Sequence, residues 1–187
     1  MGKLNVARRA VFLDRDGVLN RVMVRNGMPH PPSRLEEFEL YEDVPDGCAR
    51  LKAANFLLVV ITNQPDVGRG TQSREAVEAM HLKLRSALQP LDAIEVCYHG
   101  GDRYGQPCSC RKPRPGLILR AAAAMNIDPA RSYVIGDRWR DVDCARAAGC
   151  RVILIQRGYK ESLRDAPDFT VASFNDAVSA VLRDATP

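Results

Sequence analysis

The sequence has no apolar run long enough to cross a membrane, and its first ten residues lack the apolar core of a secretory signal. We therefore expect a cytoplasmic protein without a membrane partner. Disulfides are rare in that reducing compartment, so the six cysteines are better interpreted as metal ligands or free core thiols. Neither sign of charge predominates strongly, because 27 Lys and Arg against 23 Asp and Glu give a net charge of only +4. That excess suits a site that receives anions, but alone it does not indicate nucleic acid.

Internal repeats and low-complexity tracts are absent as well. A chain of 187 residues with 45% hydrophobic content has the size and composition of one globular domain with a full core. We predict a single domain over residues 1–187, and we expect it to be a monomer.

Short apolar runs rich in β-branched residues alternate with stretches of helical periodicity. The expected strands are residues 10–13, 56–62, 94–97, 133–135, 152–155 and 169–171. The expected helices are residues 45–55, 73–88, 115–125, 141–148 and a last one from about residue 175. This alternation implies right-handed βαβ units with helices on both faces of a mostly parallel sheet. We predict an α/β fold, a Rossmann-like three-layer sandwich.

Two carboxylates, Asp14 and Asp16, follow the first expected strand directly, and Gly17 permits a sharp backbone turn after them. Ligands bind at the carboxyl edge of an open α/β sheet, which is where these acids lie. Paired acids can hold a hard cation, and one of them can attack phosphorus. A solvated acidic turn is the alternative interpretation of this pair.

Three further positions carry polar chemistry at strand ends or before a helix. Thr62 and Asn63 end the second strand, and their hydroxyl and amide groups suit a phosphate oxygen or, alternatively, a turn. Lys112 precedes a helix, where it can neutralise a transferring phosphoryl group or form a solvated basic turn. Asp137 ends a fourth strand, and Asp141 follows it as a ligand or a helix cap.

Together these ordered motifs resemble the haloacid dehalogenase superfamily of phosphohydrolases, over about residues 10–158. The resemblance implies that Asp14 is the nucleophile of an aspartyl-phosphate mechanism and Asp16 the general acid and base. It implies that Thr62 and Lys112 hold the phosphate and Asn63 contacts the substrate. Mg²⁺ would be bound by Asp14, Asp137 and the main-chain carbonyl of Asp16, with Asp141 in support. No large cap domain is expected.

A second metal site is predicted in the loop of residues 97–110. Cys97, His99, Cys108 and Cys110 supply three thiols and an imidazole within a loop whose glycines and proline cannot form a core of their own. Such a set is typical of a closed, structural zinc site, and Zn²⁺ is its commonest occupant. A flexible loop with free thiols is the alternative.

This zinc loop narrows the resemblance to the subgroup that contains heptose bisphosphate phosphatases and histidinol-phosphate phosphatases. The run from Arg111 to Gly116 is similar to the heptose branch, in which the arginine contributes to substrate recognition. The heptose branch usually continues with Ser-Gly after the Thr-Asn-Gln of residues 62–64, whereas this chain has Pro65 and Asp66. The expected partner is therefore a small sugar phosphate, foremost D-glycero-D-manno-heptose 1,7-bisphosphate cleaved to heptose 1-phosphate, with histidinol phosphate as the alternative.

Two alternative interpretations of the sequence involve nucleic acid instead of a small sugar phosphate. A zinc-containing binding module needs aromatic side chains beside the metal loop, and only Tyr98 and Tyr104 are available there. A phosphatase acting on nucleic-acid ends would keep the fold and chemistry, and its salt dependence would reveal it. We expect no nucleic-acid partner.

Residues 21–42, with Asn26-Gly27 and several prolines, are predicted to form an irregular or hairpin-like insertion that flanks the mouth of the site.

Overall fold

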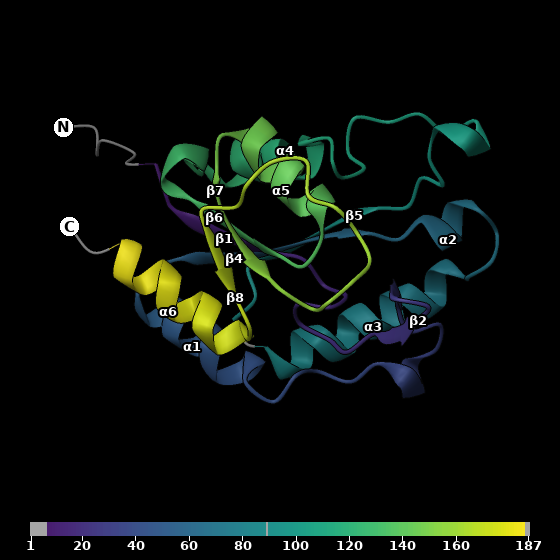
Figure 1. Cartoon of the computed structure of the whole chain (residues 1–187), viewed down its shortest axis with the longest axis horizontal. Helices are drawn as coiled ribbons and strands as arrows, with labels where there is room; N and C mark the ends of the chain where they lie inside the picture. The colour runs from purple at the N-terminus through teal and green to yellow at the C-terminus, as the bar shows by residue number, and fades with distance from the viewer. Residues whose placement is uncertain (1–6, 89, 186–187) are drawn as a thin grey trace.

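The computed structural model describes residues 7–88 and 90–185. Its centre is a six-stranded sheet in the order β5-β4-β1-β6-β7-β8, in which all neighbouring strands run parallel (Figure 1). The strands are β1 (Ala10–Leu13), β4 (Leu57–Asn63), β5 (Ala93–Cys97), β6 (Tyr133–Gly136), β7 (Arg151–Ile155) and β8 (Phe169–Val171). The predicted parallel sheet is confirmed, and each expected strand is present within one residue of its predicted bounds.

Helices cover both faces of the sheet and complete three layers (Figure 1). One face packs against α1 (Val44–Ala53), α3 (Arg74–Ala87) and α6 (Phe174–Asp184), and the other against α4 (Gly116–Met125) and α5 (Trp139–Ala148). All four residues of β1 are fully buried, and they alternate between the two cores. A strand covered on both faces must be apolar throughout, which explains its continuous hydrophobic run.

Local sequence fixes several helix ends. The Ser73 hydroxyl accepts a hydrogen bond from the amide of Ala76 and so caps α3. Gly149 ends α5 with a φ of 80°, in the left-handed region that glycine adopts without steric cost. Ser73 therefore marks where α3 begins, and Gly149 marks where α5 ends before β7.

The insertion predicted to be hairpin-like contains a hairpin of β2 (Met23–Arg25) and β3 (Met28–His30), which pair antiparallel. Asn26 and Gly27 occupy its turn, both with positive φ, as a tight two-residue turn requires. Within residues 7–88 and 90–185, four further short helices were not expected from the sequence. They are η1 (Leu35–Glu37), α2 (Pro65–Gly68), η2 (Asp102–Tyr104) and η3 (Pro129–Arg131).

The strand order places the topological switch point between β1 and β6. From β1 the chain continues to β4 and β5 on one side, then crosses to β6, β7 and β8 on the other. The connections that follow β1 and β6 lead in opposite directions, and they open a crevice at the carboxyl ends of these two strands, where open α/β sheets bind ligands. Within the described residues, no helix combines the length and apolar character needed to traverse a membrane.

Candidate active site

Lys112 lies at the centre of a buried charge cluster beyond the carboxyl ends of β1 and β6. Its Nζ is 2.8 Å from Asp14 Oδ1 and 2.7 Å from Asp141 Oδ1. Burial disfavours the lysine charge, but the carboxylates of Asp14 and Asp141 more than offset it and raise the pKa of Lys112 above its ordinary value. The lysine is therefore a fixed cation beside the predicted nucleophile.

Asp141 has two roles because each of its oxygens has a different partner. Oδ1 contacts Lys112, while Oδ2 accepts a hydrogen bond from the Arg138 amide at the start of α5. The helix cap and the supporting charge, which the sequence left as alternatives, are therefore both present.

The acids around this lysine are crowded in a way that suits a divalent cation. Carboxylate oxygens of Asp14, Asp137 and Asp141 lie within 4.8 Å of one another. Burial and, to a smaller extent, the charge of Asp141 raise the pKa of Asp14 to about 7 against the lowering effect of Lys112. Burial and the charges of Asp14 and Asp141 raise the pKa of Asp137. Asp137 Oδ1 is buried without a hydrogen-bond partner among the described residues. A hard cation satisfies such an oxygen and offsets the repulsion, so the residues fit Mg²⁺.

Asp16 does not join this carboxylate cluster with its side chain. The fully buried Arg15 guanidinium binds it with Nε and Nη2, at 3.0 to 3.2 Å. Asn20 Nδ2 donates to Oδ1 and Gln64 Nε2 to Oδ2. Donors on both oxygens hold this carboxylate at the wall of the site. The contact of its main-chain carbonyl with a cation stays a prediction.

Thr62 and Asn63 occupy the end of β4 as predicted, but they face different partners. Thr62 is only 1% exposed, and its hydroxyl accepts from Gln64 Nε2 at 2.9 Å. The Asn63 amide bonds to the main chain of Lys112 at both ends. In this arrangement Asn63 holds the lysine, and its predicted contact with substrate stays a prediction.

A cavity of about 380 Å³ opens in front of Asn63 and Lys112, and the buried Thr62 is not among its lining residues. Asp14, Asp16 and Lys112 line this cavity, and so does His30 at the end of β3 in the hairpin. Its other cations are Arg69, Arg111, Arg138 and Arg140. The hairpin therefore flanks the mouth of the site, as predicted for the insertion.

Arg111 is the cation of this cavity with the least compensation. Among the described residues it has no ion-pair partner; its Nη1 donates only to the His99 carbonyl at 3.3 Å. Burial and the nearby Arg69 charge lower its pKa. An anion bound in the cavity would relieve this repulsion and satisfy the guanidinium fork.

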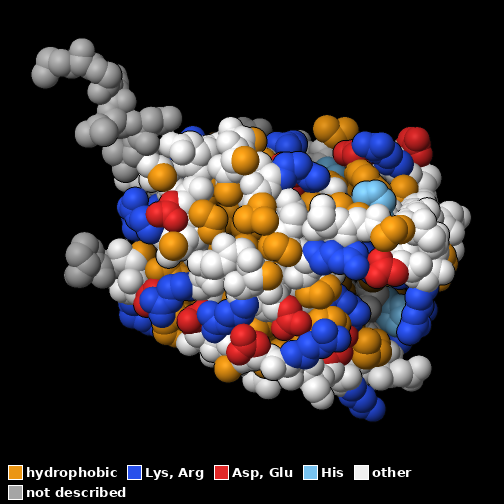
Figure 2. Space-filling model, turned by 90° about the horizontal axis from the view of Figure 1, so that it is seen from above, with side chains coloured by type: hydrophobic (Ala, Val, Ile, Leu, Met, Phe, Trp, Pro, Cys, Tyr) orange, Lys and Arg blue, Asp and Glu red, His pale blue; other side chains and the backbone are white. Residues whose placement is uncertain are grey.

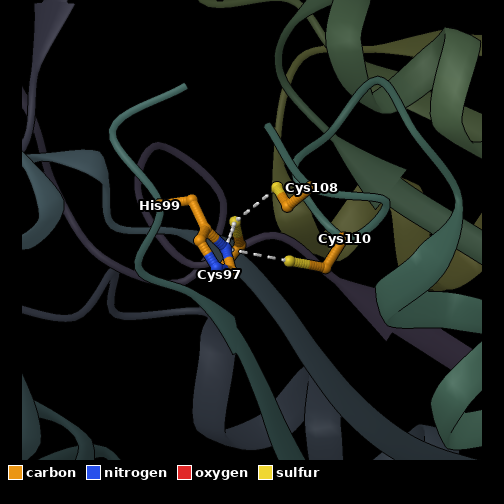
Figure 3. Close-up of side chains that lie close together, drawn as sticks. All are labelled: Cys97, His99, Cys108 and Cys110. Carbon is orange, nitrogen blue, oxygen red and sulfur yellow. Dashed lines mark hydrogen bonds between the residues drawn. The ribbon is translucent and has the colours of Figure 1, made fainter. Parts of the chain in front are cut away.

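The predicted zinc ligands converge at the base of the loop that precedes Arg111 (Figure 3). Sulfur atoms of Cys97 and Cys108 are 3.7 Å apart, and His99 Nδ1 lies 3.5 Å from Cys97 Sγ and 3.4 Å from Cys110 Sγ. Zinc–sulfur bonds of about 2.3 Å place two sulfurs of a tetrahedral site about 3.8 Å apart. The donor set and its spacing therefore fit zinc. Arg111 and Lys112 follow Cys110 directly, so this loop sets where both cations lie.

Comparisons with known proteins agree with this geometry. A family model described as HAD-hydrolase-like matches residues 109–177. The D-glycero-beta-D-manno-heptose-1,7-bisphosphate 7-phosphatase of Yersinia pestis is 34% identical over 183 residues, covering 92% of this chain and 94% of its own. The protein of the same name from Escherichia coli K12 is 34% identical over 189 residues, covering 95% and 96%. The chain belongs to the haloacid dehalogenase-like phosphatases.

A solved phosphatase of this family has the same architecture. The D,D-heptose 1,7-bisphosphate phosphatase from B. bronchiseptica, complexed with magnesium and phosphate, superposes with a TM-score of 0.80. It is 28% identical and covers 94% of this chain and 99% of its own. The predicted three-layer fold and family are thereby confirmed.

His81 and Tyr159 support this phosphatase site without belonging to its motifs. Arg15 Nη1 contacts His81 Nε2 at 3.1 Å, which links the acid pair to α3. Tyr159, in the segment after β7, donates its hydroxyl to Asp137 Oδ2 at 2.9 Å. Sequence reasoning missed these residues. A lone tyrosine or a histidine on a helix gives no local signal of a partner far along the chain.

Proposed function

We propose that this phosphatase hydrolyses D-glycero-D-manno-heptose 1,7-bisphosphate at the 7-phosphate and releases heptose 1-phosphate. The observation that carries the substrate is the pair of adjacent cations at the cavity. Lys112 pairs with two carboxylates, one of them the proposed nucleophile, and keeps a third N–H for the phosphate, whereas Arg111 has no ion-pair partner among the described residues. One cation serves the phosphate that reacts, and the other can bind a second phosphate. The names of the relatives support the same sugar.

Asp14 is proposed as the nucleophile. Its free carboxylate oxygen attacks phosphorus in line, so that an acyl phosphate bond forms while the bond from phosphorus to the sugar oxygen breaks. Asp16 gives a proton to that departing oxygen and then takes one from the water that cleaves the aspartyl phosphate. Lys112 stays in place throughout and stabilises the charge on the transferring group.

Mg²⁺ would be held by Asp14, Asp137 and the main-chain carbonyl of Asp16, with Asp141 supporting the cluster through Lys112. When bound, the ion supplies positive charge that offsets the repulsion between the nucleophile and the phosphate. Thr62 is proposed to contribute its hydroxyl hydrogen to a phosphate oxygen. That hydrogen is available because the Thr62 oxygen accepts from Gln64 rather than donating to it.

Zinc in the Cys97, His99, Cys108 and Cys110 cluster is proposed to be structural. We further propose a single catalytic domain that works as a cytoplasmic monomer, without a nucleic-acid partner. Blue and red side chains are interspersed over the face shown in Figure 2, so that this face lacks the basic stripe that a polynucleotide needs. The cavity of about 380 Å³ has the size of a small-molecule site.

A panel of phosphate esters, assayed by phosphate release with and without Mg²⁺, tests the proposal. The panel contains the heptose bisphosphate in both anomeric forms, histidinol phosphate and a 5′-phosphorylated oligonucleotide. We expect the bisphosphate to have the highest kcat/KM, EDTA to abolish turnover, and Asp14→Asn to be inactive while folded. A preference for histidinol phosphate would overturn the substrate. A preference for the oligonucleotide that falls steeply with salt would overturn the small-molecule assignment.

A further inference from the structure

The hydroxyl of Tyr159 reaches Asp137 from a segment that belongs to none of the family motifs. It donates to Asp137 Oδ2 at 2.9 Å. Because Tyr159 follows β7 and Asp137 follows β6, the bond joins the segments that leave two neighbouring strands. A phenol here is a directed donor, since a hydroxyl hydrogen satisfies one carboxylate oxygen only.

That donor divides the two oxygens of Asp137 into different roles. Oδ2 is occupied by Tyr159, while Oδ1 is buried and has no partner among the described residues. A buried carboxylate oxygen without a donor is costly in a folded protein. Because the Asp137 carboxylate belongs to the cluster with Asp14 and Asp141, a cation bound there would satisfy this oxygen. The tyrosine thus selects which oxygen stays free.

Both Asp137 and Tyr159 pack against the backbone of Gly17. A methyl group placed on Gly17 would lie 1.8 Å from Asp137 Oδ2 and 2.9 Å from the Tyr159 hydroxyl. The acidic motif after β1 therefore needs glycine at this position for contact with the other two residues. The close approach also restricts rotation of the Asp137 carboxylate.

The segment that carries Tyr159 is itself held at two points. Arg157 Nε donates to the Gly17 carbonyl at 2.8 Å. The Lys160 amide donates to the carbonyl of Gly27, at the tip of the β2–β3 hairpin, also at 2.8 Å. These bonds on either side of Tyr159 keep its ring aimed at Asp137, although the segment lies outside any helix or strand.

We propose that Tyr159 is a positioning residue that fixes Asp137 as a single-oxygen ligand, with Oδ1 toward the cation and Oδ2 held away from it. This inference rests on the proposed function, because it takes the carboxylate cluster to be the Mg²⁺ site. Partners of metal ligands that fix ligand orientation commonly change metal affinity by about 10-fold or more when removed.

The test is Tyr159→Phe, which keeps the ring and removes only the hydroxyl. Mg²⁺ binding is measured by titration calorimetry on zinc-loaded protein without substrate, so the readout does not depend on activity. We expect the dissociation constant for Mg²⁺ to rise about 10-fold. In a separate assay, kcat at saturating Mg²⁺ should return close to the parent value, because the residue acts through affinity for the ion.

Tyr133→Phe is the matched control. Its hydroxyl also donates to a carboxylate, Asp184 Oδ2 at 2.6 Å, but at the opposite end of β6. We expect Mg²⁺ affinity to be unchanged in this variant. Equal affinity of Tyr159→Phe and the parent would overturn the inference while leaving the phosphatase intact, and so would an equal loss in both variants. A parent that binds no Mg²⁺ would overturn the proposed cation role and this inference with it.

Discussion

The side-chain amide of Asn63 is paired at both ends with the main chain of Lys112. Its Nδ2 donates to the Lys112 carbonyl at 3.0 Å, and its Oδ1 accepts from the Lys112 amide at 3.0 Å. The two residues are 49 positions apart in the chain. This pairing joins the end of β4 to the turn that carries the lysine, and it fixes the backbone from which the lysine reaches Asp14.

Asn63→Ala should therefore reduce turnover through Lys112 rather than through lost substrate contact. Without the amide, two main-chain groups lose their partners, and the buried lysine is no longer held between its two carboxylates. We expect kcat to fall by about 10- to 100-fold, with a smaller change in KM, since the lysine acts mainly on the transferring phosphoryl group. Steady-state kinetics on a small aryl phosphate, with folding checked by circular dichroism, provide the measurement. A rise in KM alone would instead indicate direct substrate contact.

The core of this fold could be predicted from the sequence because its signals are local. Residues 10–13 read as a buried strand since a strand covered on both faces is apolar at every position, and β1 has those bounds. Short helices such as α2 and η2 escaped prediction because three or four residues show no helical period.

The partners of the site residues were harder to predict than the residues themselves. The family resemblance predicted that Asp14, Lys112 and Asp137 share one site, and the structure brings these three residues together. The contact between Arg15 and His81, which are 66 positions apart, depends on how α3 packs against the sheet. Sequence periodicity shows that His81 lies on a helix but not which buried charge its ring will meet.

His81 should make the stability of the protein depend on pH in mildly acid solution. Burial lowers the pKa of its ring to about 4, and the adjacent Arg15 cation acts in the same direction, while Glu78 and Asp16 oppose it. Arg15 Nη1 can only donate, so His81 Nε2 accepts and the ring is neutral when folded. The unfolded chain then binds the extra proton below its ordinary pKa of 6.5.

The resulting contribution to the free energy of unfolding is fully present above pH 6.5 and is lost as the pH falls toward 4. Its size is at most about 3 kcal/mol. In His81→Gln, whose carbonyl can still accept from Arg15, we expect urea unfolding to show a flatter pH dependence over this range. His30→Gln, at an exposed histidine of the hairpin, should retain the parent slope. An unchanged slope in His81→Gln would contradict the assignment.

Removing one thiol of the zinc cluster should act through architecture. In Cys108→Ser the hydroxyl is a poor zinc ligand, so the loop between β5 and Lys112 loses its cross-link. We expect zinc content to fall well below the parent value of about one ion per chain, a melting temperature lower by several degrees, and reduced turnover. Elemental analysis and thermal denaturation measure these effects. Cys48→Ser, at a buried thiol of α1 outside the cluster, should keep its zinc even where it loses stability.

Arg111 should distinguish a bisphosphate from a simple phosphate ester. Its guanidinium lies at the cavity next to Lys112, and among the described residues it has no carboxylate partner. A second phosphate bound there would gain a charge-assisted, two-pronged contact, whereas an aryl monophosphate has nothing to place in it. Arg111→Ala should therefore lower kcat/KM for the heptose bisphosphate by about 100-fold, and for the aryl ester by less than about 5-fold.

The matched control for this prediction is Arg103→Ala, at an exposed arginine of the loop of residues 97–110 that leads to Arg111; Arg103 does not line the cavity. It removes the same charge from the zinc loop, so any general loss of electrostatic attraction appears in both variants. Only the Arg111 variant should separate the two substrates, because Arg111 lines the cavity and Arg103 does not. Zinc content must match the parent in both, since a disordered loop would also displace Lys112 and depress both reactions. Equal losses on the bisphosphate and the aryl ester would show that Arg111 serves the reacting phosphate, and the second-phosphate site would then have to be sought among Arg69 and Arg140.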